Sequence, residues 1–479
     1  MDALDLARWQ FGITTVYHFL FVPITIGLGF LVAGFQTAWH RTGDDRWYRL
    51  TRFYGKLFLI NFAMGVVTGI VQEFQFGMNW SDYSRFVGDI FGAPLAIEGL
   101  LAFFLESTFL GLWIFGWDRL PRRLHLATIW AAATGTLLSA YFILAANSFM
   151  QNPVGYRLNE ATGRAELTDF WAVLTNPVLL VGFPHTVFAC FLTAGALVLG
   201  VAMWRLIRRP GVDTAAFRSA ARLGAAVVLV SGLGVAVSGH VQGQVMTDVQ
   251  PMKMAAAEGL YETAQPAGFS IFTIGTLDGS DEVFSLRVPR LLSYLATGDP
   301  TAAVEGIHDL QEEYAARWGD GDYAPNVPVT YWTFRLMIGT GAVAVAAAAW
   351  ALWSLRTGRA PTSRWLLRTA IALPVLPLLA NSFGWIFTEM GRQPWAVFGL
   401  MTTAAGVSPG TTTGEVALTL AGFTLVYGLL AVVEVKLLLK AVAAGLPDDP
   451  PPPEPGRPGP EAGDVQELDE DERELAFAY

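Results

Sequence analysis

Residues 12–38 read GITTVYHFLFVPITIGLGFLVAGFQTA, and this stretch decides the class of the protein. It is long enough to cross a bilayer as a helix, which needs about 20 residues, and the one side chain in it that can carry a charge near neutral pH is His18. Together with this one, nine such stretches lie along the chain, near residues 12–38, 53–76, 95–117, 125–149, 179–206, 219–240, 328–353, 366–388 and 415–440. The sequence therefore predicts an all-α integral membrane protein with nine transmembrane helices.

The composition of the 479-residue chain supports this class, because 53% of the residues are hydrophobic and only 15% are charged. The formal net charge is −10, but residues 448–479 hold 11 acids against Arg457 and Arg473, which leaves about −1 for the rest of the chain. Nucleic-acid binding needs a basic face on a soluble domain, so that function is excluded. The one cysteine, Cys190, lies in an apolar run and offers neither a disulfide nor a cysteine-ligated metal cluster.

The distribution of arginines between the spans predicts the orientation in the membrane. Alternate loops carry the groups Arg41, Arg46, Arg49 and Arg52; Arg119, Arg122 and Arg123; Arg205, Arg208, Arg209 and Arg218; and Arg356, Arg359 and Arg364. Loops rich in Lys and Arg face the cytoplasm. We therefore expect the N-terminus outside and the C-terminus on the cytoplasmic side of the membrane. The first span has no basic segment before it and no cleavage site, so we expect it to stay in the protein.

Three regions are expected along the chain. Residues 1–446 form the membrane domain, and residues 241–327 form a long outer loop between the sixth and seventh helices, whose aromatic content predicts a folded cap. Residues 447–479 are rich in proline and acids, and we expect them to be a disordered cytoplasmic tail.

Ionisable side chains inside the spans are functional candidates, because burying charge in a bilayer is costly. They are His18, Glu73, Glu98, Glu106, His185, His240, Glu389 and Glu434. With the predicted orientation, five possible ligands fall at a similar depth beneath the outer loop, each on a different helix: His18, Glu98, His185, Met337 and Glu389. A single His opposite a distant Met suits the two axial positions of a haem iron better than a metal cluster.

Glu98 and Glu106 are eight residues apart, which is about two turns or ~12 Å along an α-helix. This spacing suits a proton relay, to which the Ser139 hydroxyl could contribute, although either acid alone could instead pair with an arginine. Lys253 and Glu258 lie in the helical pattern MKMAAAEGLYE at the start of the outer loop. Alone they would be solvated charges, and their position above the candidate ligands is what makes them of interest.

Seven motifs spread over nearly the whole chain resemble the large, haem-bearing subunit of cytochrome bd-type quinol oxidases. They are RWQFGITTVYHFLFVP (8–23), APLAIEGLLAFFLEST (93–108), NSFMQNPVG (147–155), GFPHTVFA (182–189), QPMKMAAAEG (250–259), TFRLMIG (333–339) and WIFTEMGRQPW (385–395). The outer loop looks like the short form of the family's Q-loop.

The resemblance implies a role for each matching residue. His185 and Met337 match the axial ligands of a low-spin haem b, while His18 and Glu389 match the ligands of two high-spin haems. These are a haem b and a haem d, or a third haem b, and which residue serves which haem stays open. Glu98 matches the acid beside the oxygen-reducing haem, and Glu106 and Ser139 match residues on the family's proton route from the cytoplasm. Arg335 and Arg392 match arginines beside the haems, and Lys253 and Glu258 match the quinol-binding residues.

The implied function is that of a respiratory terminal oxidase of the bacterial cytoplasmic membrane, which oxidises quinol at the outer face and reduces O2 to water with cytoplasmic protons. Such a protein would generate a proton motive force without pumping, together with a second, haem-free membrane subunit and in some members small single-helix subunits. The alternatives are a cyanide-insensitive-type quinol oxidase with only haem b on the same scaffold, an ion transporter with buried Glu and His along its path, and a haem-binding sensor.

Overall fold

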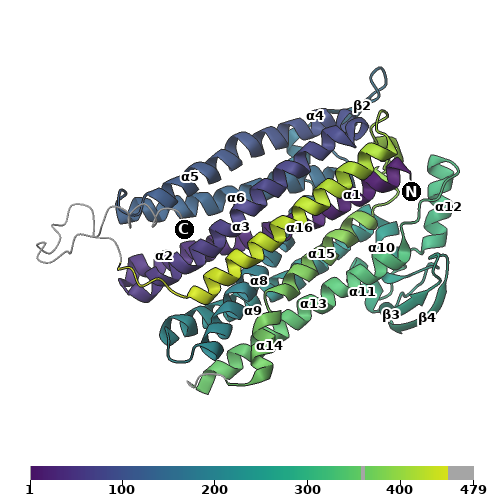
Figure 1. The fold of residues 1–479 in the computed structure, drawn as a ribbon. Coiled ribbons are helices and arrows are strands. Elements are labelled where there is room, and N and C mark those ends of the chain that lie inside the picture. The colour runs from purple at the N-terminus through teal and green to yellow at the C-terminus, as the bar shows by residue number, and fades with distance from the viewer. Residues whose placement is uncertain (1, 358–361, 451–479) are drawn as a thin grey trace, which may run out of the picture.

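The computed structural model describes residues 2–357 and 362–450, which form a bundle of long helices (Figure 1). In these ranges nine helical segments are long and apolar enough to cross a membrane, and each contains most or all of one predicted span, so the nine-helix prediction is confirmed. The segments are α1 Ala3–His18 with α2 Val22–Thr42; α3 Asp45–Met78; α4 Ser81–Ile97 with η1 Glu98–Phe103 and α5 Phe104–Phe115; α6 Arg122–Gln151; α7 Phe170–Leu174 with α8 Pro177–Arg208; α9 Thr214–Val249; α13 Val327–Ser354; α14 Arg364–Ala372 with α15 Val375–Met390; and α16 Thr413–Ala444.

Proline and capping residues explain where several of these helices begin and break. The first span breaks directly after His18, and α2 starts with Pro23 in its first turn, where the missing N–H costs nothing. Pro374 separates α14 from α15 in the same way. α16 begins with a capping box, in which the Thr412 and Glu415 side chains each accept from the other residue's backbone N–H.

Hydrogen bonds between loops show how the two ends of the bundle are assembled. At one end, Arg49 donates to Asp213 and to the carbonyl oxygen of Pro447. At the other end, the Ser408 hydroxyl donates to the carbonyl oxygen of Met78, and Gln250 donates to that of Gln151. We call the second end the loop end, because it carries residues 250–326. The N-terminus lies at this end (Figure 1).

Small residues allow the helices at the centre to approach closely. A Cβ atom on Gly224 would lie 2.8 Å from the carbonyl oxygen of Gly195, at the contact between α9 and α8. A Cβ atom on Gly200 would lie 2.6 Å from the carbonyl oxygen of Ala370 on α14. Without a hydrophobic drive between helices in lipid, such close backbone packing holds a membrane bundle together.

The segment between α9 and α13 is folded, with its own buried apolar clusters around Tyr261, Tyr314 and Leu292. Its elements are α10 Pro251–Glu258, β3 Phe269–Gly275, β4 Glu282–Val288, α11 Leu291–Thr297 and α12 Ile307–Trp318. Strands β3 and β4 form an antiparallel hairpin, in which Phe272 is opposite Leu286 and Ile274 is opposite Phe284. The sixth span runs to Val249, nine residues beyond the predicted end at residue 240.

Short elements that the sequence analysis does not predict complete the structure. They are β1 Tyr156–Asn159 and β2 Arg164–Leu167, β5 Trp395–Val397 and β6 Met401–Thr402, and the 3-10 turns η2 Leu355–Thr357 and η3 Ala404–Gly406. The expected disordered tail begins at residue 447, and its part after residue 450 lies outside the described residues.

Candidate functional site

The hydroxyl beside each candidate histidine fixes which ring nitrogen carries the proton. His18 Nδ1 lies 2.9 Å from Thr68 Oγ1, and His185 Nδ1 lies 3.1 Å from Ser238 Oγ. Each hydroxyl already donates its hydrogen to a backbone carbonyl in its own helix. The hydroxyl oxygen must therefore accept from the imidazole, so Nδ1 is protonated and the Nε2 lone pair is available for a metal. Partners of this kind orient histidine ligands in metal sites.

A glycine on a neighbouring helix lies against each of three candidate ligands. In each case an added Cβ atom would crowd the imidazole ring or the sulfur atom of the candidate ligand. The distances from the added Cβ atom are 3.1 Å from Gly69 to His18 Cε1, 3.2 Å from Gly239 to His185 Cε1 and 2.9 Å from Gly384 to Met337 Sδ. Glycine therefore provides the room in which these three side chains take their positions.

His185 and Met337 lie at the same level of the bundle. Gly232 on α9 packs against Val345 on α13, and these helices run in opposite directions. Seven residues further along α9, Gly239 therefore faces the level of residue 338 on α13. Since Gly239 contacts His185, the two predicted axial ligands project at one depth from different helices.

One row of residues on α6 contacts four of the predicted site residues in order. Its members are four, eight and four residues apart, which places them along one inclined ridge of an α-helix. From the opposite end toward the loop end, the contacts are Gly135 with Glu106, Ser139 with Glu98, Asn147 with Glu389 and Gln151 with Lys253. The helix α6 thus brings together side chains that are far apart in sequence, over ~24 Å of its length.

A π-helical segment changes the angle between Glu98 and Glu106 around the axis of the third span. In an α-helix eight residues advance ~800°, which leaves Glu106 ~80° away from Glu98 around the axis. The segment η1, Glu98–Phe103, accommodates an additional residue, so the step corresponds to seven α-helical residues and ~20°. Ser139 donates to Glu98 Oε1 at 2.6 Å, and a Cβ atom on Gly135 would lie 2.9 Å from Glu106 Cβ. Both acids therefore face α6, as the relay requires.

Glu389, at the end of α15, is held on both carboxylate oxygens. Asn147 donates to its Oε1 at 3.0 Å, and the buried guanidinium of Arg392 donates to its Oε2. Arg392 also donates to the carbonyl oxygens of Trp395 and Ala396, which fixes the position of its side chain. The structure therefore brings together Glu389 and Arg392, two of the predicted residues.

Arg335 is paired with Glu258 and still has unused donors. Its Nη2 lies 2.9 Å from Glu258 Oε2, and three aromatic rings surround the guanidinium, those of Phe269, Tyr331 and Phe334, at 4.8 to 5.1 Å. Its three guanidinium nitrogens are buried, and none makes a well-directed hydrogen bond to another described residue. Such a group suits a further carboxylate partner.

Lys253 and Glu258 belong to the same short helix, yet their charged ends take different directions. Lys253 Nζ donates to Gln151 Oε1 at 3.0 Å, beside a small cavity that Arg392 also lines. Burial, with a contribution from Arg392, lowers the pKa of Lys253 to about 7. Glu258 instead accepts from the backbone N–H of Ser270 at 2.9 Å. Burial raises the pKa of Glu258, and Arg335 partly opposes this increase.

Four polar residues of this arrangement were not among the predicted site residues: Thr68, Ser238, Asn147 and Gln151. For Thr68, Ser238 and Asn147 the sequence signal is a polar side chain inside an apolar span, and Asn147 and Gln151 both lie in the motif NSFMQNPVG. Among the described residues no three His, Cys, Asp or Glu side chains form a cluster suited to a metal ion, so the candidate ligands occur singly.

Comparisons with known proteins point in one direction. The family described as Cytochrome bd terminal oxidase subunit I matches residues 6–446. The chain is 49% identical to "Cytochrome bd ubiquinol oxidase subunit 1" of Bacillus subtilis (strain 168), over 94% of this chain and 95% of that relative. It is 38% identical to "Cytochrome bd-II ubiquinol oxidase subunit 1" of Escherichia coli (strain K12), over 93% and 97%. Its fold is similar to that of the bd oxidase from Geobacillus thermodenitrificans, with a TM-score of 0.82, 27% identity and coverage of 92% and 99%.

Proposed function

The chain belongs to the family of cytochrome bd terminal oxidase subunit I, and from this premise we propose how its residues divide the work of quinol oxidation and oxygen reduction. It is a multi-pass subunit of a membrane-bound quinol:oxygen oxidoreductase that carries haem and works with subunit II. Membership of this family argues against two of the alternatives considered from the sequence, an ion transporter and a haem-binding sensor, as the principal function.

The residues present fit haem. Two histidines offer an unprotonated Nε2, three ligands lie against glycines, and the buried Arg335 keeps donors that suit a haem carboxylate. We propose that His185 and Met337 hold a low-spin haem b, and that His18 and Glu389 hold the two high-spin haems, a haem b and a haem d or a third haem b. When bound, these groups supply electron transfer and an iron at which O2 is reduced to water. Extraction of the pigments distinguishes haem d from a third haem b.

Quinol is oxidised at the loop end, beside Glu258. A carboxyl group with a raised pKa is suited to accept a proton from a quinol hydroxyl near neutral pH. The N–H of Ser270 on β3 and the guanidinium of Arg335 on α13 both contact its Oε2 and hold it between these two elements. Lys253 is the second proposed quinol-binding residue, on the other side of α10. The loop end faces the outside, so the proton is released there.

Protons for oxygen reduction enter from the opposite end through Glu106, Glu98 and Ser139. Arg392 holds Glu389 and neutralises its charge. The single observation that carries this proposal is the row on α6, because one helix contacts Glu106, Glu98, Glu389 and Lys253 in order. Electrons from the loop end and protons from the opposite end would thus meet inside the bundle, which builds a proton motive force without pumping. Small single-helix subunits would add to this complex of the two main subunits.

Two glutamine variants of the purified two-subunit enzyme test the division of roles. We expect Glu258→Gln to slow the reduction of the haems by quinol about 100-fold, a typical loss for a general base, and to leave their reduction by dithionite unchanged. We expect Glu106→Gln to leave the reduction by quinol unchanged and to slow steady-state oxygen uptake by a similar factor. Glu312→Gln, on the exposed side of α12, is the control. If Glu258→Gln and Glu106→Gln slowed both the reduction by quinol and the oxygen uptake by the same factors, the assignment of Glu258 to quinol oxidation and of Glu106 to proton uptake would be contradicted.

A further inference from the structure

The hairpin β3–β4 has two faces of opposite character. Phe272 and Leu286 form one cross-strand pair, and Ile274 and Phe284 form the next pair on the same face. These four side chains are between 39% and 56% exposed, although all of them are large and apolar. We call them the apolar face.

The other face of the hairpin belongs to the quinol site. Ser270 bonds through its hydroxyl oxygen to Thr273 Oγ1 at 2.7 Å and to Tyr331 Oη at 2.8 Å, and its N–H donates to Glu258. Arg287, the partner of Ser270 across the strands, donates to the carbonyl oxygens of Glu258 and Gly259 and to Glu282. The charged groups of this part of the hairpin are therefore engaged away from the apolar face.

Trp332 fixes the level of the apolar face relative to the membrane. The rings of Phe272 and Trp332 are in edge contact, with centroids 5.4 Å apart. Trp332 lies near the loop end of α13, and Trp353 lies 21 residues further along, which is ~32 Å in a helix. Both are exposed, and their separation matches the ~30 Å hydrocarbon core between the two interfaces at which tryptophan is enriched. The hairpin therefore lies at the level of the lipid headgroups.

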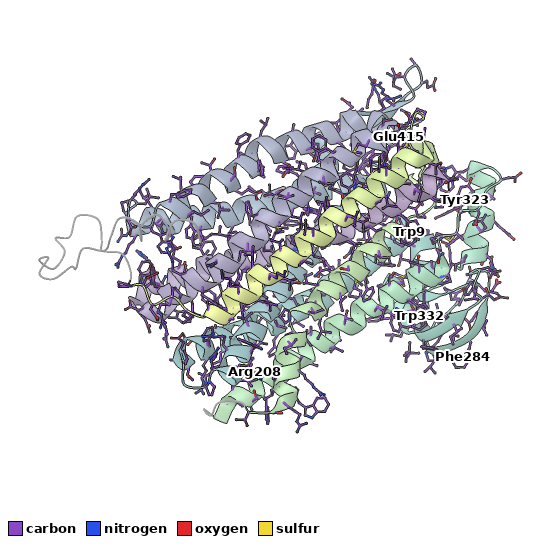
Figure 2. All side chains as sticks on the ribbon, in the orientation of Figure 1. Trp9, Arg208, Phe284, Tyr323, Trp332 and Glu415 are labelled. Atoms are coloured by element: carbon purple, nitrogen blue, oxygen red, sulfur yellow. The ribbon has the colours of Figure 1, made fainter. Side chains whose placement is uncertain are left out.

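The apolar face also continues the surface of α13 that faces lipid. Trp332, Leu336, Val343 and Trp350 are exposed and follow one another at steps of four, seven and seven residues, so they share one side of the helix. Figure 2 shows Trp332 and Phe284 at the same end of the bundle, with Phe284 further out on the hairpin. The exposed side of α13 and the apolar face of the hairpin thus form one continuous apolar surface. Since the part on α13 contacts lipid, we expect the part on the hairpin to contact lipid as well.

We propose that the apolar face of the hairpin rests on the lipid surface at the loop end and forms the wall past which quinol enters. The apolar tail of the quinol stays among the lipids on this side, while its ring reaches Glu258 on the other side of the same two strands. The contact of the apolar face with lipid is inferred from the exposed side chains alone. The entry of quinol past this face rests on the proposed function.

Spin labels test the contact with lipid directly in the two-subunit enzyme reconstituted in vesicles. The label is placed at Phe284→Cys or Leu286→Cys. Val343→Cys on α13 gives the reference for lipid, and Glu312→Cys on α12 gives the reference for water. Cys190 is buried, so labelling of the unsubstituted enzyme gives the background.

We expect the hairpin labels to collide with oxygen more often, and with a water-soluble nickel complex less often, than the label at residue 312, with values between those at residues 312 and 343. Collision with nickel as at residue 312 would show that the face meets water and would overturn the proposal. Shielding from both reagents would show that protein covers the face, and would overturn it in favour of a partner subunit.

The entry of quinol is tested by the serine variants Phe284→Ser and Leu286→Ser, combined. We expect KM for a long-tailed quinol in vesicles to rise several-fold, and KM for a short-tailed, water-soluble quinol to stay unchanged. Leu277→Ser at the fully exposed turn of the hairpin is the matched control. An unchanged KM for the long-tailed quinol would overturn the entry route. If the Glu258 site itself is wrong, Glu258→Gln fails its own test while the spin labels still report lipid, so the two failures are distinguishable.

Discussion

Individual glycines decide whether the candidate ligands can take their positions. At residue 384 an added Cβ atom would lie 2.9 Å from Met337 Sδ, which is the end of a flexible side chain. The fold can absorb this contact, because methionine has three rotatable bonds and moves aside. The sulfur atom, however, is the atom that must reach the iron. A small change in packing should therefore have a large effect on ligation.

We predict that Gly384→Ala folds, costs about 1–3 kcal/mol of stability, and loses most of the low-spin haem signal. The measurement is the reduced-minus-oxidised spectrum of the purified enzyme, with thermal unfolding alongside. Gly422→Ala on α16 is the matched control, because an added Cβ atom there meets nothing within 4 Å. A normal low-spin band in Gly384→Ala would show that Met337 is not the ligand.

The π-helical segment in the third span gives a prediction about a whole element. If its role is to keep Glu98 and Glu106 on the side of α6, removing its additional residue should leave both acids in phase. We predict that deletion of Leu100, an exposed residue of this segment, retains oxygen uptake within about threefold, since both contacts with α6 survive.

Insertion of one alanine after Leu100 is the counterpart of this deletion. It rotates Glu106 by ~100° away from Gly135, unless the helix forms a second bulge. We expect the insertion to abolish oxygen uptake while the haems are still reduced by quinol. Loss of uptake in the deletion variant as well would mean that the widened helix itself is needed.

His308 gives a second prediction for an element, the segment between α9 and α13. Its Nδ1 lies 2.8 Å from Glu262 Oε1, and its Nε2 lies 3.0 Å from the carbonyl oxygen of Ser280. Only the protonated ring can donate to both, and the hydrogen bond to Glu262, with that to Ser280, raises the pKa of His308. Asp281 acts in the same direction. Protonated His308 therefore holds α12 against the turn of the hairpin.

The sign of the pH dependence follows from the raised pKa. The stabilisation is fully present below the unfolded value of about 6.5 and is lost as the pH rises through the folded value. We predict that hydrogen exchange in residues 276–282 is slowest below the unfolded pKa and becomes faster as the pH rises through the raised pKa of the folded state, after correction for the intrinsic rate. His308→Gln should remove this difference, and Glu312→Gln should keep it. A difference that persists in His308→Gln would assign the effect to another group. The effect is modest, because the ring is partly exposed.

At the scale of the whole molecule, the sequence predicts the helices better than the contacts between them. The nine spans follow from runs of apolar residues, and Pro23 explains the break after His18. The partners of the ligands are on other helices: Thr68 is 50 residues from His18, and Gln151 is 102 residues from Lys253. No local pattern encodes such pairs. The hairpin β3–β4 was missed because its apolar residues resemble those of a buried segment until packing shows which face is left open.

The orientation of the bundle is the remaining prediction for the whole molecule. Most of the arginines between the spans lie in the loops at the end of the bundle that is far from residues 250–326. At that end Arg49 donates hydrogen bonds to Asp213 and to the carbonyl oxygen of Pro447, which belong to two other segments. Such loops stay in the cytoplasm. Quinol oxidation beside Glu258 would then release protons outside, and uptake through Glu106 would start inside. Both halves of the proposed charge separation depend on this orientation.

We predict that a membrane-impermeant maleimide labels Glu312→Cys in intact cells, and labels Val212→Cys only after the membrane is opened. Both positions are exposed and lie at opposite ends of the bundle, and the native Cys190 is buried and should not react. The reverse pattern would place the quinol site in the cytoplasm. Protons would then be released into the cytoplasm beside Glu258 and taken up from outside through Glu106, so the reaction would work against a proton motive force instead of building one.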